Sequence, residues 1–496
     1  MLQTPAQPIT EKELLNLILN DRVKEALQAI DNFEENADPL RTLLKQAAHR
    51  PNVFPELTAP YPTHFAISPS YTCNIGCEMC NAGFHISPQP YGGRDFLSPQ
   101  SWEDILPWIK EATHWCFVGV GETLDSPYLN DFLEKGMDKY TLVTTSGVGL
   151  TRRRLGELMD RKLDCLQISF EGNSAVGHGS GKAEYSRNLW EKIELVQQVK
   201  QEQDSNTPHL ELHITVNLEN LEQMNGLFER AQSLGVEHIV LFPMSINRDA
   251  RGRLVKNVYE ASFAENYEAC RSYLNEVSDR WRERGLKISF NEYGKLEEAA
   301  TPCSYVDNTL IFSGLDVPPK VCCGSLDLPH MPDGAGAKAF WNSFPFRYLR
   351  YLMFCQPEQR QPRDCQECLA THPARYFQTI REEMGREKVE TAAIYRQYQE
   401  ASVARKSLRY EEARLQFLQL QERDLPQDLR SGVWFHLGEL EVIRGELVAA
   451  RDCFENAIRE NFSHKKAFAF LYLVYRIQGA PDYLERTPRT PLRIRS

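Results

Sequence analysis

The sequence lacks long apolar runs, an excess of basic residues and the pattern of a secretory leader. No apolar stretch approaches the roughly 18 to 20 residues that cross a bilayer, so the sequence predicts no membrane-spanning helix. Its 57 lysines and arginines are outnumbered by 68 aspartates and glutamates, and the net charge of −11 argues against general binding to nucleic-acid phosphates. Thr10 and Glu13 have capping-box spacing ahead of an apolar run, which predicts a helix and not a signal peptide. We therefore expect a cytoplasmic protein without a membrane or nucleic-acid partner.

Cysteine, in contrast, is plentiful. In a reducing compartment, 13 cysteines favour metal binding or catalysis over disulfides. Three of them, Cys73, Cys77 and Cys80, lie within "YTCNIGCEMCNAG". A structural zinc site prefers four ligands, and a loop rich in glycine and asparagine is a poor core segment. Three thiolates on a 4Fe–4S cluster leave one iron without a protein ligand, open to a substrate or cofactor. The spacing predicts such a cluster.

Strand and helix patterns alternate from residue 64 to residue 244. The predicted strands are "HFAIS", "HWCFVGVG", "YTLVTTSG", "DCLQISFEG", "ELHITVN" and "EHIVLFPM". One intervening helix is predicted to begin with Ser98 as its N-cap and Pro99 at its first position. Repeated βα units predict an α/β fold with a parallel sheet and helices outside, open or closed into a barrel. The cysteine triplet directly follows the first strand, and it is therefore expected at the carboxyl edge, where such folds carry their chemistry.

At this position the triplet resembles that of the radical SAM superfamily. The resemblance implies a partial parallel (β/α)6-type barrel, in which the open iron chelates the amino and carboxylate groups of S-adenosylmethionine. The residue before the third cysteine is usually aromatic in that family, and here it is Met79. The segment "FVGVGETL" looks like the family's glycine-rich segment, with Val120 in place of the usual second glycine. Gly119, Gly121 and Glu122 would then hold the methionine amino group, because bare backbone approaches a cofactor closely.

Polar residues at later strand ends complete the cofactor site that the resemblance implies. Ser146, Ser169 and Glu171 would contact the ribose, the carboxylate or the substrate. Asn217 and the backbone near Met244 would contact the ribose and adenine. For each of these residues, an ordinary polar strand end is an open alternative.

A second group of cysteines lies between residues 300 and 370. Its order is one cysteine, a predicted β-hairpin, a second cysteine, a helix and a CxxC, which resembles the twitch half of the SPASM extension of radical SAM enzymes. The resemblance implies one auxiliary 4Fe–4S cluster, and hence two clusters in all, with the ligands Cys303, Cys322, Cys365 and Cys368. Cys323 competes with Cys322, and a zinc ribbon is the main alternative. Only Cys453 follows Cys368, which argues against a second auxiliary cluster.

The pattern after residue 385 is purely helical. "YEEARLQFLQL" and "LVAARDCFENAI" can be superposed, with Ala413 on Ala450 and Phe417 on Phe454. The second unit resembles a tetratricopeptide repeat, with residues at the characteristic offsets of that motif: Trp434, Leu437, Gly438, Ala450, Phe454 and Ala457. A generic helical bundle is the alternative. Two units are fewer than usual, so neighbouring helices would have to complete the stack.

These patterns divide the chain into five parts. The predicted parts are an N-terminal helical segment (1–58), a radical SAM core (59–300), a twitch-like auxiliary cluster domain with a small hairpin and helix (301–372), C-terminal all-α helical repeats (385–480) and a disordered tail (481–496).

The resemblance implies an enzyme that reductively cleaves S-adenosylmethionine to a 5′-deoxyadenosyl radical and abstracts a substrate hydrogen. Helical repeats are suited to gripping a peptide, so we expect epimerisation, crosslinking or oxidation of a precursor peptide, with a flavodoxin- or ferredoxin-type reductant. A dehydrogenase or epimerase of a small polyol or aminosugar, and a non-catalytic iron–sulfur scaffold, are the alternatives. An epimerase needs a thiol that returns a hydrogen atom, and Cys323 or Cys355 is the candidate donor. Cys116 and Cys165, within predicted strands, are better explained as small buried hydrophobes.

Overall fold

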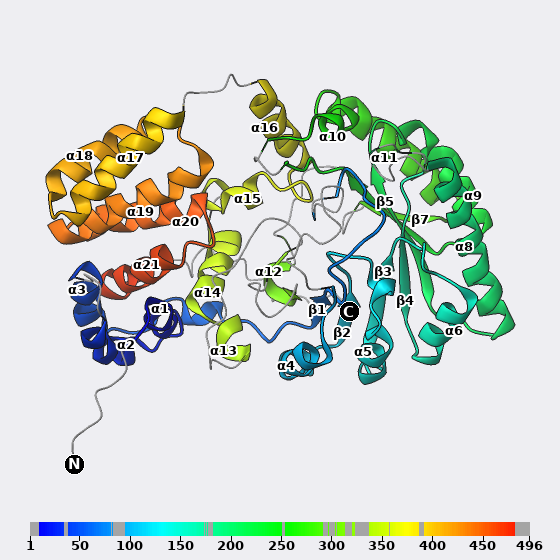
Figure 1. The fold of residues 1–496 in the computed structure, drawn as a ribbon, viewed down its shortest axis with the longest axis horizontal. Coiled ribbons are helices and arrows are strands. Elements are labelled where there is room, and N and C mark those ends of the chain that lie inside the picture. The colour runs from blue at the N-terminus through cyan, green and yellow to red at the C-terminus, as the bar shows by residue number, and fades with distance from the viewer. Residues whose placement is uncertain are drawn as a thin grey trace, which may run out of the picture.

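A parallel β-sheet stands beside a group of packed helices (Figure 1). The computed structural model describes residues 9–33, 38–80, 82, 95–172, 174, 176, 182–249, 253–290, 296, 303, 305–312, 320–322, 337–356, 358–385 and 391–481. The strands are β1 (His64–Ile67), β2 (His114–Phe117), β3 (Tyr140–Thr145), β4 (Cys165–Ser169), β5 (His209–Val216), β6 (His238–Pro243), β7 (Lys287–Phe290) and β8 (Thr309–Phe312).

The eight strands in the described part of the chain are parallel, in the order β7-β6-β5-β4-β3-β2-β1-β8. Strands β7 and β8 form the two edges and do not pair with each other, so the sheet is a partial barrel. The predicted α/β fold is confirmed. The six predicted strands correspond to β1 to β6, and β7 and β8 extend the sheet at its two edges.

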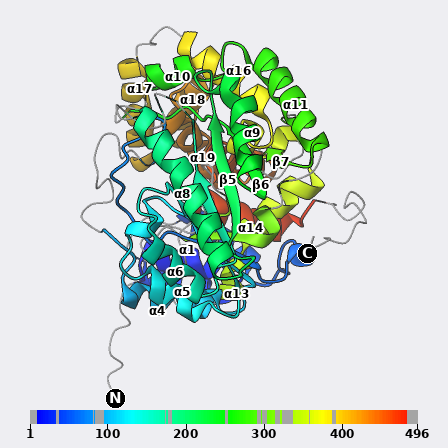
Figure 2. The same cartoon turned by 90° about the vertical axis from the view of Figure 1, so that its right-hand side faces the viewer.

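Helices cover the outer side of the sheet (Figures 1 and 2). They are α4 (Pro99–Ile109), α5 (Leu129–Lys135), α6 (Arg152–Asp160), α8 (Lys182–Glu202), α9 (Met224–Ser233) and α11 (Tyr267–Glu283). Helix α10 (Lys256–Ala261) lies at the carboxyl edge, where the Ala261 carbonyl accepts from the Leu218 amide at 2.8 Å. Helix α4 begins as predicted, because the Ser101 amide donates to Ser98 Oγ at 3.0 Å and Pro99 needs no such partner. Along β5, the period of two buries Leu210 and Leu212 fully and leaves Glu211 half-buried on the opposite face.

Strand β8 joins the auxiliary cysteine segment to the main sheet. The amides of Ile311 and Lys320 donate to each other's carbonyls at 2.8 and 3.0 Å, which is the antiparallel bridge of the predicted hairpin. On its other side, β8 pairs in parallel with β1, with His64 opposite Thr309. The first strand of the hairpin is therefore also an edge strand of the sheet, beside the strand that leads into the cysteine triplet.

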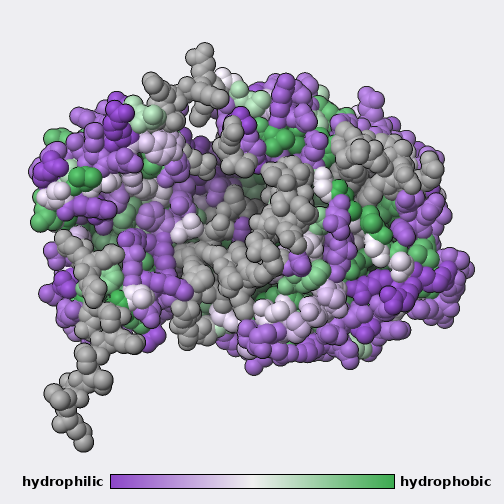
Figure 3. All heavy atoms as spheres, in the orientation of Figure 1, coloured by the Kyte–Doolittle hydropathy of each residue, from purple (hydrophilic) through white to green (hydrophobic). Residues whose placement is uncertain are grey.

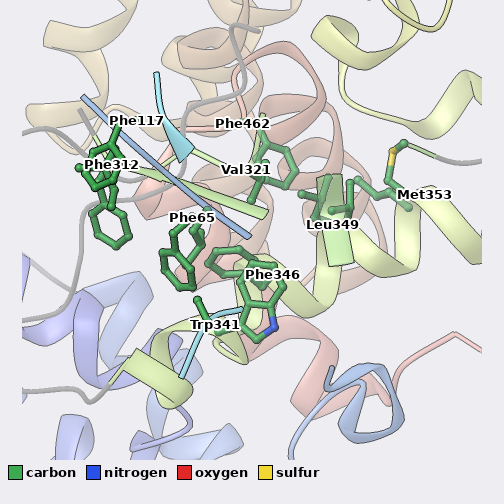
Figure 4. Close-up of a cluster of buried hydrophobic side chains, with 14 of the residues drawn as sticks. Phe65, Phe117, Phe312, Val321, Trp341, Phe346, Leu349, Met353 and Phe462 are labelled. Atoms are coloured by element: carbon green, nitrogen blue, oxygen red, sulfur yellow. The ribbon is translucent and has the colours of Figure 1, made fainter. Parts of the chain in front are cut away.

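An aromatic core continues from the sheet into the auxiliary segment (Figure 4). The helices of this segment are α12 (Tyr305–Asn308), α13 (Ala337–Trp341), α14 (Phe344–Arg350), the π-helical turn η6 (Tyr351–Cys355), α15 (Arg363–Gln366) and α16 (Pro373–Gly385). The rings of Phe65 and Phe312 stack with centroids 5.8 Å apart, and Trp341 and Phe346 lie beside them in the same core. Val321 is fully buried in this cluster, which fixes the backbone just before Cys322.

The C-terminal helices pack in pairs. They are α17 (Thr391–Lys406), α18 (Tyr410–Gln421), α19 (Gln427–Arg444), α20 (Leu447–Glu460) and α21 (Lys465–Gln478). A Cβ atom at Gly438 of α19 would lie 2.4 Å from the ring of Phe454 in α20, so the glycine permits the close approach of this pair. Phe454 and the residues superposed in the sequence, Ala413, Ala450 and Phe417, are all fully buried. The prediction of packed helix pairs is confirmed, and the tetratricopeptide identity stays a prediction.

The N-terminal helices α1 (Glu11–Leu19), α2 (Val23–Ala29) and α3 (Asp38–Ala47) continue this stack beyond α21. Helix α1 begins with the predicted capping box of Thr10 and Glu13. Between α1 and α2, the Asp21 carboxylate accepts two hydrogen bonds from Arg347 of α14, at 2.7 and 2.8 Å, and one from the Tyr472 hydroxyl of α21. One carboxylate thus ties together the N-terminal segment, the auxiliary segment and the C-terminal helix.

The face of the molecule in Figure 3 is largely hydrophilic, and its apolar residues occur in small separate groups. Among the helices in the described part of the chain, none combines the length and the apolar character needed to span a membrane.

We predict that replacing Asp21 by alanine lowers the free energy of unfolding by about 3 kcal/mol, because the Arg347 side chain, only 4% exposed, would lose its charged partner. Urea unfolding followed by circular dichroism measures the change. The matched control is Asp31→Ala, which removes an exposed carboxylate 3.4 Å from Arg41 and should cost less than about 1 kcal/mol. Equal effects of the two substitutions would contradict this role of Asp21.

Candidate functional site

The loop that carries the cysteine triplet is attached to the sheet by backbone contacts. The Gly121 amide donates to the Ser70 carbonyl at 3.1 Å, and the Glu122 amide donates to the Thr72 carbonyl at 2.8 Å. A Cβ atom at Gly121 would lie 2.4 Å from the Thr72 carbonyl oxygen and 2.8 Å from that of Ser70. The predicted glycine segment after β2 therefore contacts the cysteine loop itself, and only glycine fits at residue 121.

The three thiols lie close enough together to influence one another electrostatically. Cys73, Cys77 and Cys80 are each half-buried, and the Cys80 amide donates to the Cys77 carbonyl at 3.1 Å. Burial raises the pKa of Cys77, and the neighbouring Glu171, Cys80 and Cys73 raise it further. Burial also raises the pKa of Cys73, with contributions from Glu122 and Cys80. Thiolates close to two carboxylates repel these negative charges, and the positive charge of a bound metal centre would offset that repulsion.

The donor set suits a multi-iron cluster. Among the residues that the structure describes, no group of three or more His, Cys, Asp or Glu side chains is close enough together to hold a metal ion. The thiolates of an iron–sulfur cluster bind different irons, so they stand further apart than the ligands of one ion. Three soft sulfur donors in a partly buried loop are the ligands that such clusters take.

Glu122 joins the ends of β2 and β3. Its side chain is buried, with Oε1 accepting from the Leu124 amide at 3.1 Å and the Thr145 hydroxyl at 2.5 Å, and Oε2 accepting from the Ser146 amide at 2.8 Å. An ionised carboxylate has about four acceptor positions. The predicted contact with the methionine amino group would use the remaining one.

Asn217 holds a segment that touches the cysteine loop. It is fully buried, its Nδ2 donates to Ser174 Oγ at 2.9 Å, and its Oδ1 accepts from the Glu219 amide at 2.9 Å. Just beyond Ser174, the Val176 carbonyl accepts from the Met79 amide at 3.1 Å. The contact of Asn217 with the ribose stays a prediction, and the contacts in the structure give this residue an organising role.

The other predicted cofactor residues also lie at the carboxyl edge. Ser169 ends β4 and is half-buried, and Glu171 follows it with 4% of its surface exposed. Met244 follows β6, is buried, and donates its amide to the Val216 carbonyl at 2.9 Å. Gly119 follows β2, where an added Cβ would lie 3.2 Å from Ser68 Cβ.

Asn247, which the sequence analysis did not single out, contacts the cysteine loop directly. Its Nδ2 donates to the Glu78 carbonyl at 2.6 Å and lies 3.4 Å from the Cys80 carbonyl. The opposite amide orientation would press Oδ1 against two carbonyl oxygens. Oδ1 is buried and has no hydrogen-bond partner among the described residues. The one feature of the sequence that could have identified Asn247 is its place in "FPMSIN", just beyond the sixth predicted strand.

The second cysteine group also comes together. Burial raises the pKa of Cys365 well above its usual range, and three further thiols nearby raise it more: Cys322, Cys368 and Cys303. All four are partly buried. The structure thus gathers the four predicted auxiliary ligands, and Cys323 lies outside the described residues.

The remaining cysteines lie within secondary structure. Cys355 ends the π-helical turn η6, 5% exposed in the main core, where burial raises its pKa. Burial raises the pKa of Cys116 in β2 to about 12, and Cys165 in β4 is 1% exposed. A hydrogen-donating role for Cys355 stays a prediction.

No model of a known protein family matches the chain. Among solved structures, native anSMEcpe with bound AdoMet is 15% identical, with a TM-score of 0.45 over 65% of this chain and 95% of that chain. Streptococcus suis SuiB bound to precursor peptide SuiA is 12% identical, with a TM-score of 0.43 over 68% of this chain and 83% of that chain. BtrN in complex with AdoMet and 2-DOIA is 17% identical, with a TM-score of 0.22 over 27% of this chain and 52% of that chain. These weak similarities do not establish a family.

We predict that Gly121→Ala displaces the cysteine loop, because the new Cβ would meet the Thr72 carbonyl at 2.4 Å. After anaerobic reconstitution, the variant should bind about four irons fewer than the unsubstituted protein, the content of one 4Fe–4S cluster. Gly149→Ala is the matched control, since its Cβ would meet Leu124 at an ordinary 3.5 Å. Full iron content in the Gly121 variant would contradict the requirement for a bare backbone.

Proposed function

We propose that the chain is a radical SAM enzyme in which Cys73, Cys77 and Cys80 hold a 4Fe–4S cluster that binds S-adenosylmethionine at its open iron. The observation that carries this proposal is the gathering of three thiols at the carboxyl edge of the sheet, with no other cysteine in the chain before Cys116. When bound, the cluster and S-adenosylmethionine supply a carbon radical that removes a substrate hydrogen.

The residues around the thiols would bind and orient S-adenosylmethionine. Gly119 and Gly121 would present their peptide groups to the methionine amino group, and their missing side chains let the segment that leads into the cysteine loop pack against the end of β2. The carboxylates of Glu122 and Glu171 lie within electrostatic reach of the thiols. Carboxylates attract the cationic sulfonium group of the cofactor and can accept hydrogen bonds from an iron-bound amino group. Ser146 and Ser169, with the backbone of Met244, offer hydrogen-bonding groups for the ribose, the carboxylate and the adenine.

The four auxiliary cysteines would hold a second 4Fe–4S cluster. Their gathering around Cys365 supports a closed site, in which every iron has a thiolate and none is left for a substrate. Such a cluster is suited to accepting or returning an electron. A flavodoxin- or ferredoxin-type protein would supply the reducing electron for the first cluster.

We further propose that the substrate is a precursor peptide. The packed pairs α17–α18 and α19–α20, continued by α21 and the N-terminal helices, form an extended helical stack beside the auxiliary segment (Figure 1). Stacked helix pairs present long surfaces that hold a peptide segment away from the reacting residue. The net reaction proposed is epimerisation, crosslinking or oxidation of one residue.

Anaerobic reconstitution followed by addition of dithionite and S-adenosylmethionine tests the activity. We expect 5′-deoxyadenosine, detected by mass spectrometry, and roughly eight irons per chain. Replacing the three cysteines by alanine should abolish 5′-deoxyadenosine and leave about four irons. Cys453→Ala, a matched control in α20, should change neither value. Absence of 5′-deoxyadenosine from the fully loaded protein would favour the non-catalytic scaffold.

The same assay in deuterated water tests the substrate class. A pool of precursor-like peptides should stimulate 5′-deoxyadenosine formation and yield a peptide with altered mass, whereas a panel of amino sugars should not. Deuterium uptake at one α-carbon would indicate epimerisation, and loss of hydrogens would indicate oxidation or crosslinking. Stimulation by the amino sugars alone would refute the peptide assignment and leave the radical chemistry standing.

A further inference from the structure

Helix α16 begins at the second cysteine group and packs against the α/β domain that carries the first. At its start, the His372 amide donates to the Cys368 carbonyl at 2.7 Å, and the Tyr376 amide donates to the His372 carbonyl at 2.9 Å. Phe377 anchors the helix to the α/β domain, with its ring 6.1 Å from that of Phe263 and 5.4 Å from that of Tyr267. The backbone of the last auxiliary cysteine is therefore continuous with a helix packed on the sheet domain.

Helix α16 also holds the loop that follows β6. The Tyr376 hydroxyl accepts a hydrogen bond from the Ile246 amide at 2.8 Å. Two residues further along the loop, Arg248 pairs with Glu383 near the end of α16, with one N–O distance of 2.7 Å. Ile246 is 6% exposed, so its amide depends on the tyrosine and not on solvent.

Asn247 lies between Ile246 and Arg248, and it connects the loop after β6 to the loop that carries the cysteine triplet. Its Nδ2 donates to the Glu78 carbonyl and lies within 3.4 Å of the Cys80 carbonyl. A continuous chain of hydrogen bonds and peptide groups thus runs from the Cys368 carbonyl through α16 and Tyr376 to Ile246, Asn247 and the Cys80 carbonyl.

We propose that Tyr376 and Asn247 are positioning residues that make the placement of Cys80 depend on the auxiliary cysteine segment. The inference rests on the proposed function and extends it, because it makes S-adenosylmethionine binding at the first cluster sensitive to a helix outside the barrel. Removing the Tyr376 hydroxyl leaves the buried Ile246 amide without its acceptor, and the loop that braces Cys80 loosens.

Tyr376→Phe and Asn247→Ala test the inference in the full-length, reconstituted protein. The electron paramagnetic resonance spectrum of the reduced protein is recorded with and without S-adenosylmethionine, together with the affinity for that cofactor and the rate of iron loss to a chelator. We expect about tenfold weaker cofactor binding, faster iron loss and a smaller cofactor-induced spectral change in both variants. Matched controls are Tyr61→Phe, whose hydroxyl bonds the Trp108 carbonyl, and Asn275→Ala, whose amide bonds the Leu296 backbone.

A purely structural role would lower the melting temperature of the variants and the controls alike and leave the cofactor-induced spectral change intact. That result, or equal cofactor affinity in the unsubstituted protein and both variants, overturns the inference. The phenylalanine variant keeps its ring packing, so it decides the question if the alanine variant does not fold. If the unsubstituted protein shows no spectral response to S-adenosylmethionine, the proposed function itself fails, and this inference falls with it.

Discussion

The position of the three clustered cysteines depends on a backbone contact that leaves no room for a side chain. Gly121 sits against the carbonyls of Ser70 and Thr72, and the amides of Gly121 and Glu122 donate to these same carbonyls. The loop that leaves β1 is thereby fastened to the end of β2. Strand β1 itself lies between β2 and β8, so both of its neighbours hold it in register. These contacts fix the start of the loop that carries the three thiols.

The charges around the three thiols affect their protonation. Burial and neighbouring carboxylates disfavour the thiolates, yet thiolates are the forms that bind metal. Metal binding would have to offset this cost, so we expect binding to release protons from these thiols and to weaken as the pH falls. Glu122 accepts one hydrogen bond from Leu124 in its own segment and two from Thr145 and Ser146 at the end of β3, which keeps the carboxylate rigid beside the site. A rigid carboxylate orients a cationic ligand better than a mobile one.

The sequence predicted the parts of this structure that local patterns determine. The alternation of apolar and polar residues predicted strands β1 to β6, and the residue types at Thr10 and Ser98 predicted the N-caps of two helices. The spacing of cysteines gave two groups, and the structure gathers the second group around Cys365. Contacts between distant segments carry no such local signal. Three such contacts depend on register and packing that one sequence does not display. They are the pairing of β8 with β1, the packing of α1 and α3 on α21, and the approach of the Asn247 side-chain amide to the Cys80 carbonyl. Asn217 and Glu122 were identified by position, but their hydrogen bonds within the protein required the structure.

The central claim is that the ligand missing from the cysteine triplet is S-adenosylmethionine. The most direct measurement is electron–nuclear double resonance on the reduced, reconstituted protein with S-adenosylmethionine carrying a nitrogen-15 amino group. The account predicts a hyperfine coupling from that nitrogen, because the amino group binds the open iron, and predicts its loss when Cys73, Cys77 and Cys80 are replaced by alanine. A reduced cluster at these cysteines that shows no nitrogen-15 coupling with saturating cofactor would contradict the account.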